Sequence, residues 1–158
     1  MNLKKILLLT LIVLVPLISH AQKYPTSLSV QGGYSWINGV VGGDLQVGHI
    51  GLSGGWMPTV MPLSGDKINS IGFAATYYTG DFDEPFISYV SLGTATNGFR
   101  YEDSNGYEYS EAMTIVMVSF KGYSNNWTFK AGVGYGWCPS GEAWTFEVVL
   151  GYSLFNNK

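Results

Sequence analysis

Charged residues are scarce in this chain: they make up 12% of its 158 residues, about half the share usual in soluble domains. Lysine and arginine number eight against eleven acids, which leaves a net charge of −3. An acidic chain of this kind does not attract phosphates, so we expect no nucleic acid as a partner. The single cysteine, Cys138, excludes an internal disulfide.

The chain also lacks a run of about 20 apolar residues, the length that a membrane-spanning helix needs. Its longest apolar stretch, Ile6–Ile18, follows two lysines and is followed by small residues that end at Ala21. This pattern predicts a secretory signal peptide over residues 1–21, cleaved after Ala21, rather than an anchoring helix. The remaining residues, 22–158, are expected to form one domain.

Aromatic residues and glycine are abundant, with 15% aromatics and 21 glycines, a composition that does not suit disorder. Most of the chain alternates apolar and polar residues with a period of two, which predicts β-strands. In the last run, Trp144, Phe146 and Val148 share one face, and Thr145 and Glu147 share the other. Eight such runs can be placed, at residues 27–36, 40–48, 50–57, 68–79, 86–99, 110–124, 127–137 and 144–155.

Short turn signals join these runs into hairpins. Asn38-Gly39, Gly48-His49 and Asn125-Asn126 each predict a two-residue turn, and pairing about each of them brings apolar residues opposite one another. The fifth run is the exception. Pairing it with the sixth about Asn105-Gly106 points Phe86, Val90 and Leu92 inward, and it points outward Ile87, Tyr89, Ser91, Gly93 and Ala95.

Two features indicate that the apolar face of these strands looks outward, into lipid. The polar face consists mainly of Gly, Ser, Thr and Gln, which suits the narrow interior of an eight-stranded barrel. All five tryptophans lie at strand ends, as in an aromatic girdle: Trp36, Trp56, Trp137 and Trp144 at one rim and Trp127 at the other. The sequence therefore predicts an all-β fold, an eight-stranded antiparallel up-and-down transmembrane β-barrel.

The carboxyl-terminal run from Glu147 to Phe155 resembles the terminal signal of outer-membrane barrels, with a glycine, alternating apolar residues and a closing aromatic. In size and layout the chain is similar to small eight-stranded barrels of the OmpX and OmpA-transmembrane-domain type. The resemblance implies a monomer in the bacterial outer membrane, with both termini in the periplasm. It also implies two partners, outer-membrane lipid and the barrel-assembly machinery.

Four charged residues fall on the inward face and are expected to form a polar network in the lumen: Asp44, Lys121, Lys130 and Glu147. The turn at Asn125-Asn126 sets Lys121 opposite Lys130, and two facing ammonium groups need a carboxylate nearby. Glu147, on the adjacent strand, is the closest choice, whereas Asp44 must reach across the barrel. The network is interpreted as packing of the interior, with ion conduction as the alternative.

The hairpin between the fifth and sixth runs is acidic and rich in tyrosine. Pairing about Asn105-Gly106 sets Arg100 opposite Glu111 as a cross-strand ion pair. A ribbon of this kind, projecting beyond the bilayer, could bind an extracellular protein by strand addition. The residues assigned to this outer hairpin are Arg100, Tyr101, Glu102, Tyr107, Tyr109 and Glu111.

No pattern in the sequence predicts an enzyme, a cofactor or a metal site. His49, the one histidine after the leader, falls in a short turn, and Asp81, Asp83 and Glu84 lack the spacing of a calcium loop. The favoured function is therefore a non-enzymatic outer-membrane barrel with a structural or surface-interaction role through its outer loops. Two alternatives stay open: a narrow channel or transporter of small apolar ligands, and a soluble exported barrel that binds a ligand.

Overall fold

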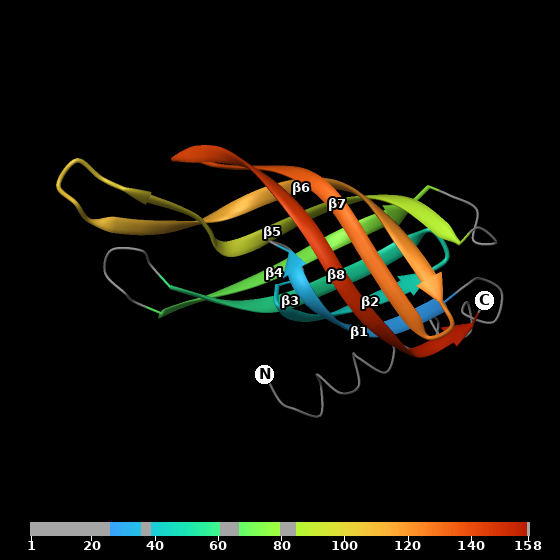
Figure 1. Cartoon of the computed structure of the whole chain (residues 1–158). Coiled ribbons are helices and arrows are strands. Elements are labelled where there is room, and N and C mark those ends of the chain that lie inside the picture. Colours follow the sequence, from blue (N-terminus) through green and yellow to red (C-terminus); the bar gives the residue numbers. More distant parts are fainter. Residues whose placement is uncertain (1–25, 36–38, 61–66, 80–84, 158) are drawn as a thin grey trace, which may run out of the picture.

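The computed structural model describes residues 26–35, 39–60, 67–79 and 85–157. The expected signal peptide (1–21), Trp36 and the acidic residues at 81–84 lie outside these ranges. Eight strands account for almost all of the described chain (Figure 1). They are β1 (Thr26–Ser35), β2 (Val41–Val47), β3 (Ile50–Val60), β4 (Lys67–Tyr78), β5 (Phe86–Glu102), β6 (Glu108–Ser124), β7 (Trp127–Cys138) and β8 (Gly141–Asn157). Among the described residues no helix is long and apolar enough to cross a membrane.

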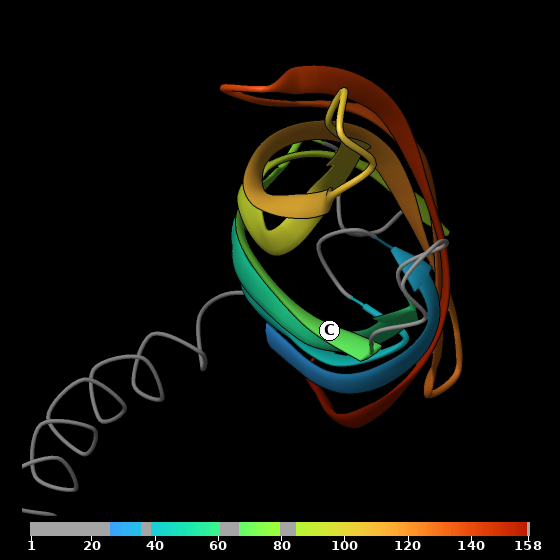
Figure 2. The ribbon, with the colours of Figure 1, turned by 90° about the vertical axis from the view of Figure 1, so that its left-hand side faces the viewer.

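The strands form one closed sheet. Each strand pairs antiparallel with the next along the chain, and β8 pairs with β1 to complete the circle. The view along the barrel shows this ring, with the β5–β6 hairpin nearest to the viewer (Figure 2). The predicted eight-stranded antiparallel up-and-down barrel is confirmed.

Tight turns join strands at the end of the barrel where the chain enters β1. Val47 pairs with Ile50 across Gly48-His49, and Ser124 pairs with Trp127 across Asn125-Asn126. Gly48 (φ 57°) and Asn125 (φ 54°) adopt the left-handed conformation that such turns require. Both predicted two-residue turns are confirmed.

The register of the first hairpin differs from the prediction. A two-residue turn at Asn38-Gly39 would pair Trp36 with Val41 and Gly33 with Asp44. In the structure Gly32 pairs with Val41, and Ser29 pairs with Asp44. The connection is therefore longer than a two-residue turn at Asn38-Gly39. The shift is by an even number of residues, so the inward and outward faces stay as predicted.

The orientation predicted for the fifth strand is wrong. Phe86, Val90 and Leu92 are exposed on the outer surface. The residues expected to point outward instead share the inward-facing set of positions: Ile87, Tyr89, Ser91, Gly93 and Ala95.

The reason for the reversal lies in the hairpin tip. Glu102 pairs with Glu108, so the loop holds the five residues from Asp103 to Tyr107 where two were assumed. Exchanging an even loop for an odd one moves the register by one and reverses every side chain. A further irregularity places two extra residues on β5 between Ala95 and Phe99, and this even shift leaves the faces unchanged.

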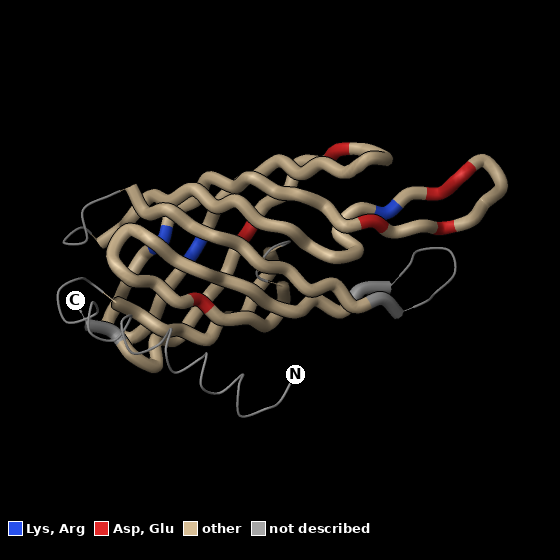
Figure 3. Tube along the Cα trace, turned by 180° about the vertical axis from the view of Figure 1, so that it is seen from behind, with Lys and Arg blue, Asp and Glu red and all other residues tan. Residues whose placement is uncertain are grey.

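Apolar side chains cover the outer surface of every strand. On β8, the outward residues Trp144, Phe146 and Val148 are 49% to 78% exposed, whereas the inward residues Thr145 and Glu147 are at most 4% exposed. Figure 3 shows where the charged residues lie: few are in the body of the barrel, and several acidic ones lie on the long β5–β6 hairpin. The fold therefore turns its apolar face outward and its small and polar face inward.

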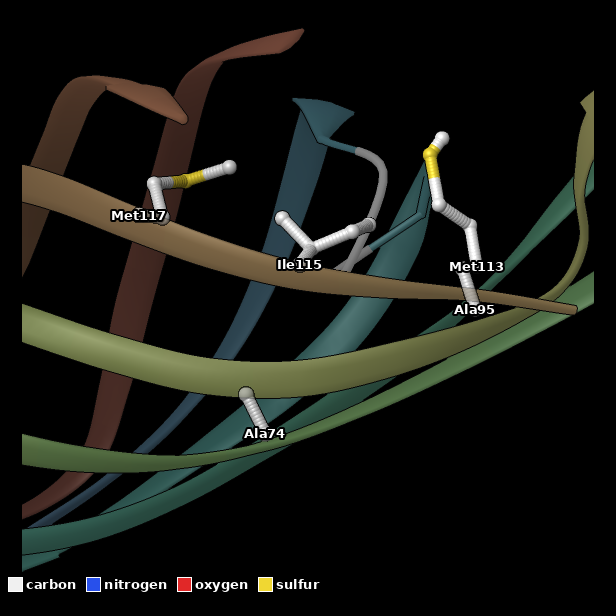
Figure 4. Packing of buried hydrophobic residues seen from close by; sticks show 5 residues of the cluster. All are labelled: Ala74, Ala95, Met113, Ile115 and Met117. Carbon is white, nitrogen blue, oxygen red and sulfur yellow. The ribbon is translucent and has the colours of Figure 1, made fainter. Parts of the chain in front are cut away.

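The interior itself has two parts. Toward the tight-turn end it holds charged and hydrogen-bonding side chains, among them Asp44 and Lys121. Toward the end with the long hairpin it holds an apolar cluster, formed by Ala74, Ala95, Met113, Ile115 and Met117. Figure 4 shows the three β6 members of this cluster projecting from the same side of their strand.

Close packing inside the barrel makes a single methyl group costly at Gly132. A Cβ added there would lie 1.8 Å from Ser119 Oγ and 2.6 Å from the Val118 carbonyl oxygen. We expect Gly132→Ala to lower the free energy of unfolding by about 1–3 kcal/mol, as overpacked sites do. Urea unfolding in phospholipid vesicles measures the change.

The matched control for Gly132→Ala is Ala131→Val, which enlarges the neighbouring side chain on the outward face of β7. It is expected to unfold at the wild-type urea concentration. An unfolding midpoint of Gly132→Ala equal to that of wild type would contradict the packing described here.

Candidate functional site

The charged part of the interior is built around Asp44. Lys121 Nζ lies 2.6 Å from Asp44 Oδ2, and Lys130 Nζ lies 2.8 Å from Asp44 Oδ1. The register of β6 and β7 places the two lysines directly opposite each other, as predicted. The side chain of Asp44 is fully buried, so one carboxylate bridges two ammonium groups away from water.

Lys121 has further partners around its ammonium group. It donates to Gln46 Oε1 at 3.0 Å and lies 3.5 Å from Ser27 Oγ. Its Nζ also lies 5.3 Å and 5.1 Å from the ring centroids of Tyr78 and Tyr123. The face of an aromatic ring attracts a cation, so these two rings compensate for part of the hydration that the Lys121 ammonium group loses on burial.

Glu147 forms a second centre beside the first. Its carboxylate accepts hydrogen bonds from the hydroxyl groups of Ser35, at 3.2 Å, and Tyr89. From its place on the adjacent strand, Glu147 was predicted to be the carboxylate nearest to the two lysines, with Asp44 across the barrel. The structure corrects this prediction, because Asp44 spans the narrow lumen and is the carboxylate of both ion pairs.

The four charges balance, with two lysines against two acids. Removing ions from water costs several kcal/mol each, and that cost is offset only by close pairing and full hydrogen bonding. The network thus fills and closes this part of the interior. A carboxylate engaged by two ammonium groups is poorly placed to act as a base.

Several members of this network were not predicted from the sequence: Gln46, Tyr78, Tyr89 and Tyr123. Gln46 and Tyr123 lie two residues from Asp44 and Lys121 on their strands, so the period of two already placed them inward. Tyr89 was missed because the register assumed for β5 pointed it outward. Tyr78 donates to Asp44 Oδ1 at 3.4 Å from β4, a contact that only the closed barrel creates.

The outer ribbon is the part of the β5–β6 hairpin from Phe99 to Glu111, beyond the main body of the barrel. Tyr101 and Tyr109 pair directly and their rings stack, with centroids 5.5 Å apart. At the tip the Asp103 carboxylate accepts backbone hydrogen bonds from Tyr107 at 3.0 Å and Asn105 at 2.8 Å. These bonds hold the pKa of Asp103 below its usual value, and the bond from the Tyr107 backbone contributes most.

The predicted pairing of Arg100 with Glu111 is wrong, because the five-residue loop sets Arg100 opposite Ser110. Glu111 instead turns toward the β7–β8 connection. Its carboxylate accepts hydrogen bonds from Ser140 Oγ at 2.7 Å and Ser140 N at 3.2 Å, and the first of these lowers the pKa of Glu111. The base of the outer ribbon is thereby tied to the neighbouring hairpin.

Tryptophan and tyrosine pair at both ends of the β7–β8 hairpin. Trp127 packs edge-on against Tyr152 near the tight turns, and Trp144 packs edge-on against Tyr135 near the other end. Trp56 and Trp137 are also exposed at that second end, where Trp56 Nε1 donates to Asn69 Oδ1 at 3.2 Å. The described tryptophans therefore occupy the two ends of the outer surface.

The remaining residues singled out in the sequence have local partners. His49 Nδ1 lies 2.7 Å from the Tyr78 carbonyl oxygen at the tight-turn end. Cys138 is a free thiol whose Sγ lies 3.4 Å from the Gly141 carbonyl oxygen.

Comparisons with known proteins give limited information. No protein-family model matches the sequence, and no curated protein matches it. Among solved structures, the backbone of the Yersinia pestis outer membrane protein Ail in a phospholipid bilayer nanodisc is similar, with 13% sequence identity and a TM-score of 0.48. That alignment covers 83% of this chain and 99% of that one.

The buried ion pairs predict a large effect of Asp44→Asn. Loss of the carboxylate leaves two buried ammonium groups without their counter-charge, and breaking a buried pair in this way costs about 3–5 kcal/mol. We expect the free energy of unfolding to fall by that amount, as measured by urea titration in vesicles.

Two further variants separate charge from packing. Adding Lys121→Met, Lys130→Met and Glu147→Gln to Asp44→Asn should restore much of the lost stability, because the network then holds no buried charge. The matched carboxylate replacement Asp103→Asn, on the exposed hairpin tip, should leave global stability unchanged. Equal midpoints for Asp44→Asn and Asp103→Asn would contradict the role assigned to Asp44.

Proposed function

We propose that the chain is a non-enzymatic integral barrel of a bacterial outer membrane. The observation that carries this proposal is the continuous belt of exposed apolar side chains around all eight strands. Soluble monomers rarely expose contiguous apolar patches larger than a few hundred Å². Lipid offers no hydrogen-bond partner to a sheet edge, and the closed ladder leaves no such edge around the barrel wall.

The height of the belt fits a bilayer. Trp127 and Trp137 lie ten positions apart on β7. At about 3.4 Å per residue and a tilt of about 40°, they are separated by about 26 Å along the barrel axis. The apolar band of outer-membrane barrels is about 25 Å tall and is bounded by aromatic girdles.

The lengths of the connections support an orientation. Barrels of this class have short periplasmic turns and longer loops outside. Gly48-His49 and Asn125-Asn126 are tight turns, and the outer ribbon projects from the opposite end. We therefore place both termini in the periplasm and the outer ribbon outside the cell.

Epitope accessibility tests membrane location and orientation together. One tag replaces Ser104-Asn105-Gly106 at the hairpin tip, and a second tag follows Lys158. On intact cells an antibody should bind the first tag, and it should reach the second only after the outer membrane is opened. Recovery of the protein in the soluble periplasmic fraction, or labelling of the second tag on intact cells, would contradict the proposal.

We further propose that the outer ribbon binds an extended, basic segment of another protein. The β4–β5 ladder ends at Ala95 and the β6–β7 ladder at Thr114, whereas β5 and β6 continue pairing to Glu102 and Glu108. Within the described residues, both edges of the ribbon thus lack a neighbouring strand, and such edges accept an added strand. The ribbon carries one arginine and four acids, which favours a cationic partner.

Removal of the ribbon tip tests this partner. In the variant, residues 101–109 are replaced by Asn-Gly, which leaves Phe99, Glu111 and the barrel in place. Nanodiscs of the wild type should bind an alternating lysine–valine peptide and protect ribbon amides from hydrogen exchange, and nanodiscs of the variant should not. The matched glutamate–valine peptide should bind neither. Equal binding of the basic peptide to both proteins would refute this interaction.

A structural role suits the interior better than conduction or catalysis. Charged side chains and the apolar cluster occupy the lumen in two successive parts. The interior of an eight-stranded barrel is just wide enough for its side chains to fill. The packed lumen therefore supports a role exercised at the outer surface.

A further inference from the structure

The wall of the barrel is uneven at the end that carries the outer ribbon. β1 last pairs with β8 at Ser35–Glu147, but β8 begins six residues earlier along the chain, at Gly141. On the other side β2 last pairs with β3 at Val41–Trp56, and β3 continues to Val60. Figure 1 shows β1 and β2 ending well short of the other hairpins. Among the described residues, the wall between β8 and β3 is therefore low over the β1–β2 hairpin.

A cavity of about 490 Å³ opens at this low part of the wall. Its lining residues are Tyr34, Val40, Met57, Pro58, Gly98, Phe99, Arg100 and Ala143. Seven of these eight residues are uncharged and mostly apolar, and Arg100 supplies the single charge. Cavities of this size with an apolar lining and few polar groups are typical ligand sites.

The cavity connects the lumen with the outer surface. Met57 is buried and points inward, whereas Tyr34 is 37% exposed and lies on the outward face of β1, where its ring stacks on Phe146. Both line the same cavity. A ligand in the cavity can therefore contact both the interior and the outer surface of the barrel.

The apolar cluster lies next to the cavity, separated from it by two lining residues. Phe99 and Ala143 line the cavity and also pack against the cluster that includes Met113 and Met117 (Figure 4). A Cβ added at Gly136 would lie 2.4 Å from Met113 Sδ, so the methionine uses space that a glycine leaves open. Methionine side chains are unbranched and change conformation readily, so Met113 and Met117 can adjust to a ligand in the neighbouring cavity.

Below the cluster the interior is closed. Lys121 lies farther along β6 than Met117, toward the tight turns, and its ion pair with Asp44 begins the charged part of the lumen. The apolar cluster and this network together separate the cavity from the tight-turn end of the lumen. The arrangement is that of a binding site rather than of a passage.

We propose that this cavity binds a single acyl chain that carries an anionic headgroup. The acyl chain lies against Met57, Phe99 and Ala143, and the headgroup meets the Arg100 guanidinium at the mouth. Guanidinium groups bind carboxylates and phosphates through paired hydrogen bonds. The ligand is either a free fatty acid or a chain of a membrane phospholipid, since both have this chemistry. The inference uses the bilayer location proposed above but not the protein partner of the outer ribbon.

Photo-crosslinking in phospholipid nanodiscs tests the site. The probes are lauric acid with a diazirine at its terminal carbon and an anionic phospholipid with the same diazirine on one acyl chain. We expect at least one of them to label the inward residues Met57, Phe99 or Ala143, as located by mass spectrometry. Labelling by the fatty acid alone identifies a free ligand, and labelling by the phospholipid identifies a membrane source. Labelling confined to outward residues such as Leu52 with both probes would overturn the proposal.

A matched pair of variants separates binding in the cavity from contact with surrounding lipid. Ala143→Phe fills the cavity from its wall and should reduce inward labelling about tenfold. Ala75→Phe makes the same change on the outward face of β4 and should leave inward labelling unchanged. Heat-modifiable gel migration shows that both variants are folded barrels. Equal inward labelling in the two variants would overturn the site, whereas absence of a folded barrel from the nanodiscs would instead count against the membrane location.

The headgroup assignment has its own test. Arg100→Gln should weaken competition by lauric acid about tenfold and leave competition by 1-dodecanol nearly unchanged, with diazirine labelling of Met57 as the readout. An equal effect on the acid and the alcohol would refute the contact between Arg100 and an anion.

Discussion

Closure of the sheet between β1 and β8 is the constraint on which the other features of this protein depend. Once the ladder closes, each strand residue within the barrel wall faces either the lumen or the outer surface, because side chains alternate with a period of two. On β8, the exposure of Trp144, Phe146 and Leu150 and the burial of Thr145 and Glu147 follow from the same register. The belt outside and the network inside are thus two results of one geometry.

The lumen is narrow enough for charged side chains on opposite walls to form ion pairs across it. Asp44 on β2 contacts Lys121 on β6 and Lys130 on β7. Neither of these two strands is next to β2 in the sheet, and both are far from it in the sequence. Glycine on the inward face makes room for larger neighbours, as Gly136 does for Met113. Small residues, long charged residues and methionines together fill an interior that holds little else, and the one cavity argued to bind a ligand lies where the wall is lowest.

The sequence predicted the strands, their number and their faces well, because alternation and tight turns are local signals. Gly48-His49 and Asn125-Asn126 each fix a register within a few residues, and the opposition of Lys121 and Lys130 followed from the second. The orientation of β5 was predicted wrongly because it depends on whether the loop after Glu102 has an even or an odd number of residues. The dipeptide Asn105-Gly106 alone does not determine that number.

Contacts across the lumen could not be predicted from the sequence for a different reason. Alternation tells which residues point inward, but the pairing of Asp44 with both lysines depends on the shear and width of the closed barrel. The inward position of Met113, Ile115 and Met117 was available from the phase of Lys121 on the same strand. The alternation alone could not show that these three residues meet Ala74 and Ala95 in one cluster, or that two neighbours of this cluster, Phe99 and Ala143, line a cavity.

The most direct test of the central claim is the accessibility of spin labels along β8. Single cysteines would be placed at Phe146, Val148 and Leu150 and, separately, at Thr145 and Val149, in a Cys138→Ser background in phospholipid vesicles. Collisions with oxygen, which concentrates in lipid, should be frequent at the first three positions and rare at the other two, with little contact with a water-soluble nickel chelate at any of them. High oxygen accessibility at Thr145 and Val149, or free access of the nickel chelate to Phe146, Val148 and Leu150, would contradict an outward apolar face in a bilayer.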